Sequence, residues 1–345
     1  MNSIRTLPAS WFTNQNILDI EKRAVLLKGW YLLGPTVRFA KETEVDYEFA
    51  GVVIHVHKVS EDEFQITRQS DGIVMPHYQT PTGLIFTTID TSAPSFEEYF
   101  PPTLLPLLNA HDFRRLPHRR KLSYPGRFNW KTMVDGYQEC LHCQYTHREF
   151  SVLYPPTFYA VQNDGNISRH FADERYTEAK DGLFLYFFPI CTLNLYGGGM
   201  SSFRVCPGEK AGETRMEFDY YYLNQKAINA VKAEAESEGR EETAEEVEKA
   251  GLDGFEEYFR FVRRVAMEDF ELCEVAQSNL ERGVYCQGVL NGAKEGGVKH
   301  YQGLVRERVL RQFKEEQNAE ERGHEDQAIQ ADRGTAGRVE VASHA

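Results

Sequence analysis

A short run in the middle of the chain holds side chains that could bind a metal. Within residues 129–147, Glu139 precedes His142 by three positions and His147 follows His142 by five. Two imidazoles and a nearby carboxylate suit a ferrous ion with open coordination positions. On a helix, Glu139 and His142 are neighbours, whereas His142 and His147 point roughly 140° apart. One ion can bind both histidines only if the helix ends, kinks or bulges between them; two partly exposed histidines on a helix are the alternative.

A carboxylate far along the chain adds a third candidate ligand. The apolar residues of one predicted long helix recur at helical spacing: Tyr258, Phe259, Val262, Val265, Ala266, Cys273, Ala276 and Leu280. Asp269 lies on this apolar face, and a buried carboxylate is normally paired or bound to metal because isolation is very costly. From the residues alone, Asp269 could be a metal ligand, or it could form a salt bridge to an arginine within residues 260–264 or an interhelix hydrogen bond. The neighbouring Glu268, Glu271 and Glu274 fall beside or opposite the face, so we expect them to be solvated.

The elements around these residues predict an α+β fold. Asn14 can cap an N-terminal helix, and alternating β-branched runs between about residues 45 and 90 predict a small β domain. Strands between residues 183 and 223 predict a curved antiparallel sheet that grips the long helix of residues 255–280, and a last helix covers about residues 298–313. The expected organisation is 1–40, an N-terminal helix packing on the catalytic domain; 41–100, the small β domain; 101–128, a connector; 129–315, the metal-binding catalytic domain; and 316–345, a disordered tail.

Composition excludes several classes of protein. The net charge of −13 and the absence of a basic patch argue against a nucleic-acid partner. The first ten residues lack the apolar core of a secretory signal, and no apolar run is long enough to span a membrane. The six cysteines at 140, 143, 191, 206, 273 and 286 show no paired framework, which predicts reduced thiols in a cytoplasmic protein. Cys140 and Cys143 have Cys-x-x-Cys spacing, but without a βαβ context we do not expect a thioredoxin-like role.

Four segments resemble one known family, the alpha subunits of Rieske non-heme iron oxygenases (aromatic-ring-hydroxylating dioxygenases), and especially their choline/carnitine monooxygenase-like branch. The segments are Asn129-Trp130-Lys131 through His147, residues 267–274 around Asp269, residues 7–13, and residues 298–302. The likeness covers most of residues 5–60 and 83–313. It implies a helix-grip catalytic domain preceded by a small Rieske-like β domain, and assembly as a homotrimer.

The resemblance also implies roles for individual residues. His142, His147 and Asp269 correspond to the facial triad that holds Fe(II) in the family. Glu139 corresponds to the catalytic carboxylate that carries electronic contact between neighbouring subunits.

One part of the family pattern is missing. In the family, a Cys-x-His and a Cys-x-x-His pair hold a [2Fe–2S] cluster on the N-terminal β domain. No cysteine precedes Cys140 here, and His55, His57 and His77 cannot build that cluster without thiolates. We therefore expect no [2Fe–2S] cluster from this chain and describe its β domain as a reduced Rieske-like domain.

The function that the resemblance implies is an Fe(II)-dependent mono- or dioxygenase. Its substrate would be a small molecule such as a quaternary amine, oxidised with O2 using electrons from an external reductase, a cluster-bearing partner or the substrate itself. The alternative is a catalytically inactive binding or regulatory paralogue that retains the fold. Six aromatic residues could form a pocket wall or simply belong to the core: Tyr137, Tyr145, Tyr186, Phe187, Phe188 and Tyr196.

Overall fold

A seven-stranded antiparallel sheet forms the centre of the molecule in the computed structural model, which describes residues 4–172 and 182–341. Its strand order is β7-β13-β12-β11-β10-β9-β8. The strands are β7 (His118–Gly126), β8 (Tyr159–Asp164), β9 (Ile167–Ala172), β10 (Leu183–Phe187), β11 (Cys191–Tyr196), β12 (Gly199–Pro207) and β13 (Thr214–Tyr222). The sequence predicts β10 to β13. It does not predict β7, which lies in the expected connector and becomes a strand by pairing with β13 along its whole length.

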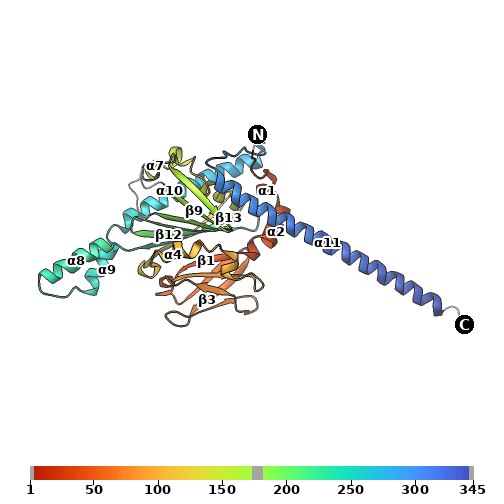
Figure 1. Cartoon of the computed structure of the whole chain (residues 1–345), viewed down its shortest axis with the longest axis horizontal. Coiled ribbons are helices and arrows are strands. Elements are labelled where there is room, and N and C mark those ends of the chain that lie inside the picture. Colours follow the sequence, from red (N-terminus) through yellow and green to blue (C-terminus); the bar gives the residue numbers. More distant parts are fainter. Residues whose placement is uncertain (1–3, 173–181, 342–345) are drawn as a thin grey trace.

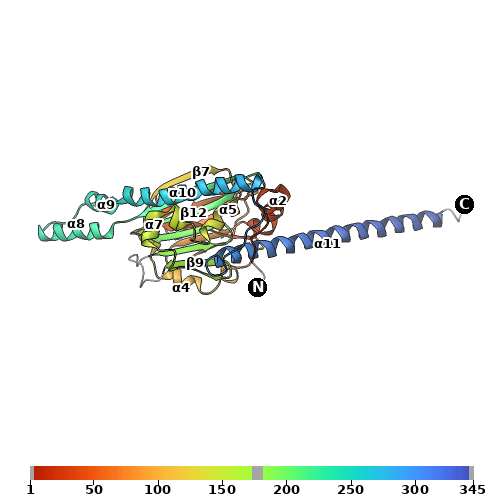
Figure 2. The same cartoon turned by 90° about the horizontal axis from the view of Figure 1, so that it is seen from above.

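A long helix crosses one face of this sheet. It is α10 (Phe255–Glu281), which runs over the strands in Figure 2 and buries Phe255, Tyr258, Phe259 and Phe270. The shorter α5 (Trp130–Tyr137) contacts both α10 and β12. The predicted arrangement of an antiparallel sheet around one long helix is confirmed.

Two three-stranded sheets form a small β region on the opposite side of the large sheet from α10 (Figure 1). One has the order β1-β6-β5 and the other β2-β3-β4. Their bounds are β1 (Trp30–Pro35), β2 (Glu44–Phe49), β3 (Val52–Lys58), β4 (Phe64–Arg68), β5 (His77–Gln79) and β6 (Leu84–Thr88). Tyr31 of β1 stacks on Phe49 of β2 at 4.1 Å between ring centroids, which joins the two sheets through a shared core. The α+β fold class, with a small β domain before the catalytic one, is confirmed.

Short helices complete the body of the molecule. They are α1 (Ser10–Thr13), α2 (Gln15–Ala24), α3 (Phe96–Tyr99), α4 (Leu104–Asn109), α6 (Cys143–Thr146), α7 (Arg148–Leu153), α8 (Gln225–Ser237) and α9 (Ala244–Leu252). The Asn14 side chain accepts a hydrogen bond from the Asn16 N–H and caps α2, as predicted. In the described residues, no helix combines the length and the apolar character that crossing a membrane requires.

The C-terminal segment differs from its prediction. The sequence predicts a disordered tail after residue 315, whereas α11 (Gly296–Val341) continues through it as one helix that projects from the body (Figures 1 and 2). Glu, Gln, Ala and Arg, which recur in this segment, are strong helix formers, and no proline interrupts it. Its low apolar content, the basis of the prediction, excludes core packing but not a solvated helix.

Candidate metal centre

Helix α5 leads into the predicted metal-binding run and is fixed at its start. The Asn129 side chain accepts a hydrogen bond from the Lys131 N–H at 3.1 Å, and the Asn129 N–H donates to Gln277 Oε1 of α10 at 3.1 Å. Lys131 Nζ lies 2.7 Å from Glu21 Oε2 of α2, and both side chains are fully buried. These contacts fix α5 against α2 and α10. Separating Lys131 from Glu21 would leave an uncompensated charge in the core, which is strongly destabilising.

The chain leaves the helix before it reaches the candidate ligands. Helix α5 ends at Tyr137, so Glu139 and His142 lie in the turn before α6, and His147 lies between α6 and α7. Glu139 and His142 therefore do not share a helix face, as they would on one continuous helix. A regular helix would direct His142 and His147 away from each other. Because the helix is broken here, both imidazoles can turn toward the same point.

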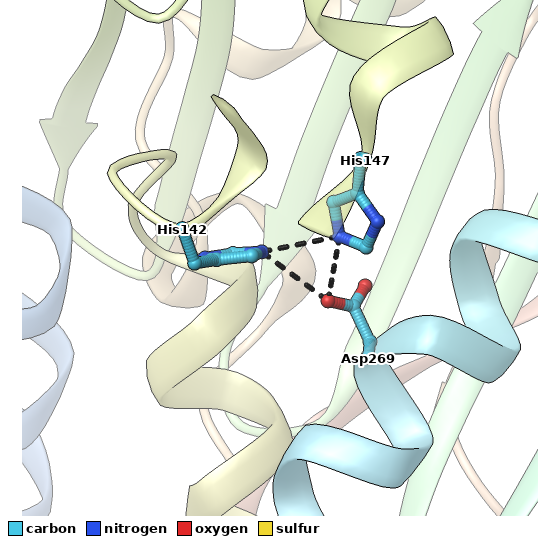
Figure 3. A group of neighbouring side chains, drawn as sticks. All are labelled: His142, His147 and Asp269. Carbon is cyan, nitrogen blue, oxygen red and sulfur yellow. Dashed lines mark hydrogen bonds and ion pairs between the residues drawn. The ribbon is translucent and has the colours of Figure 1, made fainter. Parts of the chain in front are cut away.

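The three predicted ligands converge (Figure 3). His142 Nε2 lies 3.2 Å from His147 Nε2 and 3.2 Å from Asp269 Oδ1, and His147 Nε2 lies 2.9 Å from the same oxygen. Within the described part of the chain, this is the only group of three His, Cys, Asp or Glu side chains whose donor atoms lie close enough to hold one metal ion. The arginines within residues 260–264 bond elsewhere: Arg263 to Tyr124 and Arg264 to Glu149.

The spacing of the donor atoms fits a small divalent cation. Metal–ligand bonds of about 2.1 Å that meet at roughly right angles place neighbouring donors about 3 Å apart. The two nitrogens and the oxygen are separated by 2.9 to 3.2 Å, which is the spacing of one triangular face of an octahedron. Such a 2-His-1-carboxylate face suits Fe(II) and leaves the opposite positions open.

Each imidazole is also held at its other nitrogen by a carboxylate. His142 Nδ1 bonds to Glu139 Oε1, and His147 Nδ1 lies 2.8 Å from Glu268 Oε2. Carboxylates in this position fix the ring orientation and raise the basicity of the coordinating nitrogen. Glu268 was expected to be solvated, and its contact with His147 corrects that expectation.

Charges at the site compensate one another closely. Burial works against the charged form of His142, but hydrogen bonds to Asp269 and Glu139 outweigh it and raise its pKa to about 10. The pKa of His147 is also raised, because Asp269 and Glu268 outweigh its burial. Burial alone would raise the pKa of Asp269, yet hydrogen bonds from both imidazoles lower it to about 2. At the point where the Nε2 atoms converge, the site therefore presents one carboxylate, Asp269, to two imidazoles. A cation bound there can replace the imidazole protons.

A cavity of about 120 Å³ opens beside the three ligands, between the sheet and α10. Its wall is rich in aromatic residues, which include Tyr137, Tyr159, Phe184, Tyr196, Phe203 and Phe261. Of the six aromatic residues considered from the sequence, only Tyr137 and Tyr196 line it; Tyr145 is exposed, and Tyr186, Phe187 and Phe188 belong to the core. Asn194 contributes a polar edge and bonds to the Tyr137 hydroxyl at 2.7 Å.

Two cysteines of the same run are joined. Cys140 and Cys143 form a disulfide with an S–S distance of 2.07 Å, while Cys191, Cys206, Cys273 and Cys286 are free. The prediction of six reduced thiols is therefore wrong for this pair. The turn that follows α5 brings the two Cα atoms to 5.1 Å, within the range that a disulfide requires.

The small β region places its histidines apart from the triad. His55 on β3 lies 2.8 Å from Asp46 Oδ1 on the neighbouring β2, a partly exposed cross-strand pair. His57 lies on the same strand and His77 on β5. The expectation that this chain builds no [2Fe–2S] cluster stays a prediction.

Relatives of the chain can be recognised in sequence. The family described as "Ring hydroxylating alpha subunit (catalytic domain)" matches residues 113–180 and 162–311, together more than half of the chain. The carnitine monooxygenase oxygenase subunit of Escherichia coli (strain K12) is 26% identical over 247 residues, which cover 65% of this chain and 58% of that protein. The match thus spans less than two thirds of the length of this relative.

Solved structures share the fold at lower identity. The quaternary ammonium Rieske monooxygenase CntA in complex with its substrate L-carnitine matches with a TM-score of 0.65 and 17% identity, over 89% of this chain and 96% of that chain. Naphthalene 1,2-dioxygenase from Rhodococcus sp. bound to indole matches with a TM-score of 0.60 and 12% identity, over 88% and 94%. The family match covers more than half of the chain, and the solved structures have the same fold. This chain therefore belongs to the ring-hydroxylating alpha subunit family.

Proposed function

We propose that this protein is an Fe(II)-dependent oxygenase in which His142, His147 and Asp269 hold the iron. The observation that carries the proposal is the convergence of two nitrogens and one oxygen within 3.2 Å of one another beside an aromatic cavity. When bound, Fe(II) supplies open coordination positions for O2. Glu139 and Glu268 orient the imidazoles through their Nδ1 atoms.

The substrate that we propose is a small quaternary amine. The E. coli relative is named a carnitine monooxygenase subunit, and CntA is described with L-carnitine and γ-butyrobetaine as substrates. Aromatic faces attract a quaternary ammonium group by cation–π contacts, and Tyr159, Phe184 and Tyr196 offer such faces along the cavity. Asn194 and Tyr137 supply hydrogen-bonding groups for a polar end of the substrate.

The electrons for O2 reduction come, in this proposal, from outside the small β region. We propose an external reductase or a cluster-bearing partner as the donor, a homotrimer as the assembly, and the cytoplasm as the location. Glu139 is the carboxylate through which a neighbouring subunit would make electronic contact, because it reaches His142 from the side away from Asp269.

Iron binding tests the ligand assignment directly. The protein is loaded with Fe(II) without oxygen, and bound iron is measured for the wild type, His142→Ala and Asp269→Ala. We expect nearly one iron per wild-type chain and a loss of at least about a hundredfold in affinity in each variant, because each ligand contributes several kcal/mol. His55→Ala is the matched control, since this histidine lies on the small β region and should leave iron binding unchanged. Equal iron in all four proteins would disprove the triad.

Oxygen consumption separates the oxygenase from an inactive paralogue. The iron-loaded protein is given a reductant, O2 and a panel of quaternary amines, each paired with a neutral analogue in which carbon replaces nitrogen. A cation–π pocket should favour the charged compound by about 0.5 to 2 kcal/mol. Product formation from the quaternary amines supports the oxygenase. Tight binding of both iron and amine without product would instead support a binding or regulatory role.

A further inference from the structure

The disulfide in the ligand-bearing run lies against the proposed iron site. Cys140 and Cys143 flank His142 in the chain, and Cys143 Sγ lies 4.0 Å from His142 Nε2, the nitrogen directed at Asp269. Both cysteines are buried, at 6% and 4% exposure, and both line the same cavity as the triad. The two sulfurs therefore share one small compartment with the iron ligands.

A purely structural role explains this disulfide poorly. The bridge joins residues only three positions apart, and the stabilisation that a disulfide provides grows with the length of the loop that it closes. The segment is already fixed by the anchored start of α5 and by aromatic packing, since Tyr154, Tyr159 and Phe184 form one buried cluster with the two cysteines. Disulfides in cytosolic proteins are usually catalytic or redox-sensing, and the cytoplasm is the location proposed above for this protein.

We propose that Cys140 and Cys143 form a redox-active pair that stores two electrons for the reaction at the iron. This inference rests on the proposed oxygenase function and names one source of its electrons. The reduced pair carries two thiols. Closing the S–S bond releases two electrons and two protons, the number that one monooxygenation consumes.

The overall reaction balances for atoms and electrons. A substrate C–H bond, one O2 and the protein dithiol give a C–OH bond, one water and the protein disulfide. Without substrate, the dithiol and O2 give the disulfide and one hydrogen peroxide. An external dithiol regenerates the pair by thiol–disulfide exchange and is itself oxidised to a disulfide.

Thiol counting in a single turnover tests this proposal without requiring a known substrate. The protein is reduced with a small dithiol, freed of it by gel filtration without oxygen, and divided into iron-free and Fe(II)-loaded samples. Both receive O2, and free thiols are alkylated at intervals and located by mass spectrometry. In the loaded sample, we expect thiols 140 and 143 to disappear together, about tenfold or more faster than without iron, because a metal-linked oxidation should outrun uncatalysed thiol oxidation. Hydrogen peroxide should form at one molecule per pair.

Two variants complete the test. The double variant Cys140→Ser, Cys143→Ser should still bind iron but lose the stoichiometric burst of peroxide, whereas Cys286→Ser, which removes an exposed free thiol in a loop, should retain it. The pair proposal is overturned if thiols 140 and 143 oxidise equally fast with and without bound iron, or if the double variant keeps the burst. Failure of the wild type to bind iron overturns the oxygenase proposal as well, so the two failures are distinguishable.

Discussion

Two clusters in this protein, one partly buried around Asp269 and one buried around Asp219, each place an aspartate among basic side chains, but with opposite consequences. At the metal centre, Asp269 faces His142 and His147. On the other face of the large sheet, Asp219 of β13 faces Arg38 at 3.4 Å and Arg204 at 3.1 Å. His118 approaches Asp219 at 3.0 Å. The pKa of each aspartate is lowered to about 2, although burial opposes the shift in both.

The two clusters differ in whether the basic partners of the aspartate can lose a proton. An arginine keeps its proton at any pH that a protein survives, so Asp219, Arg38 and Arg204 form a permanent salt bridge between the small β region and the sheet. An imidazole can lose its proton and offer a lone pair instead. The cluster around Asp269 can therefore exchange protons for a metal ion. Asp219 has only one imidazole beside it, His118, together with two arginines that cannot bind a cation, so its cluster holds the two parts of the fold together.

Truncation of Asp219, the aspartate that joins the small β region to the large sheet, should have the largest effect on stability. Asp219→Ala leaves Arg38 and Arg204 buried without their counter-charge, and removal of one partner from a buried ion pair costs about 3–5 kcal/mol. Urea unfolding should show this loss, while the folded fraction still binds one iron per chain. Loss of iron binding with unchanged stability would reverse the assignment of the two clusters.

The same truncation at the metal centre should separate binding from stability. In iron-free Asp269→Ala, the imidazoles can become neutral, so we expect destabilisation of only about 1–3 kcal/mol, the usual cost of unpaired polar groups. Iron affinity should nevertheless collapse, which equilibrium dialysis with Fe(II) would measure. A loss of stability as large as that of Asp219→Ala would show that Asp269 also acts mainly as a structural anchor.

Replacement of Glu268, the carboxylate that contacts His147 Nδ1, should have an intermediate effect on iron affinity. Glu268→Gln removes the negative charge that orients and polarises this ring, and loss of such a partner typically weakens metal affinity about 10- to 100-fold. Glu271→Gln is the matched control, because Glu271 is an exposed residue on the same helix. Equal affinities in the two variants would mean that Glu268 contributes nothing to the site.

These residues also show how far the sequence could predict the site. The spacing of His142 and His147 and the apolar face around Asp269 left metal binding and structural roles open, because local periodicity does not show which side chains meet. The resemblance to Rieske oxygenase alpha subunits is what singled out these three residues as ligands. Glu268 was missed because its contact depends on how α10 lies against the turn after α6, which no local pattern encodes. The Cys140–Cys143 bond was missed for a similar reason, since it depends on where α5 ends.

The same limit applies to the fold. Strands β10 to β13 have the apolar patterns that predict them, whereas β7 is polar and its pairing with β13 is a long-range property. The polar C-terminal segment has helix-forming residues but little apolar surface, so its helix in α11 could not be inferred from core packing.

The pH dependence of stability should give the finest distinction between the clusters. The raised pKa of His142, about 10, means that its contribution in iron-free protein is fully present below its unfolded pKa near 6.5 and is lost as pH rises toward 10. The lowered pKa values of Asp269 and Asp219 act at the other end, because their contributions are present above about pH 4 and are lost as pH falls toward 2.

Urea unfolding between pH 6.5 and 10 can isolate the metal centre when the wild type and both variants are compared in a His118→Gln background, since the partners that remain around Asp219 are then arginines, which do not titrate there. The stability advantage of iron-free wild type over His142→Ala should shrink as pH rises, by no more than about 1.4 kcal/mol per pH unit for one proton. The advantage of wild type over Asp219→Ala should stay constant over the same range. Iron-loaded wild type should not show the alkaline loss, because the metal then occupies the place of the proton. A parallel decline for both variants would mean that the two clusters titrate alike and that the distinction drawn from their side chains is wrong.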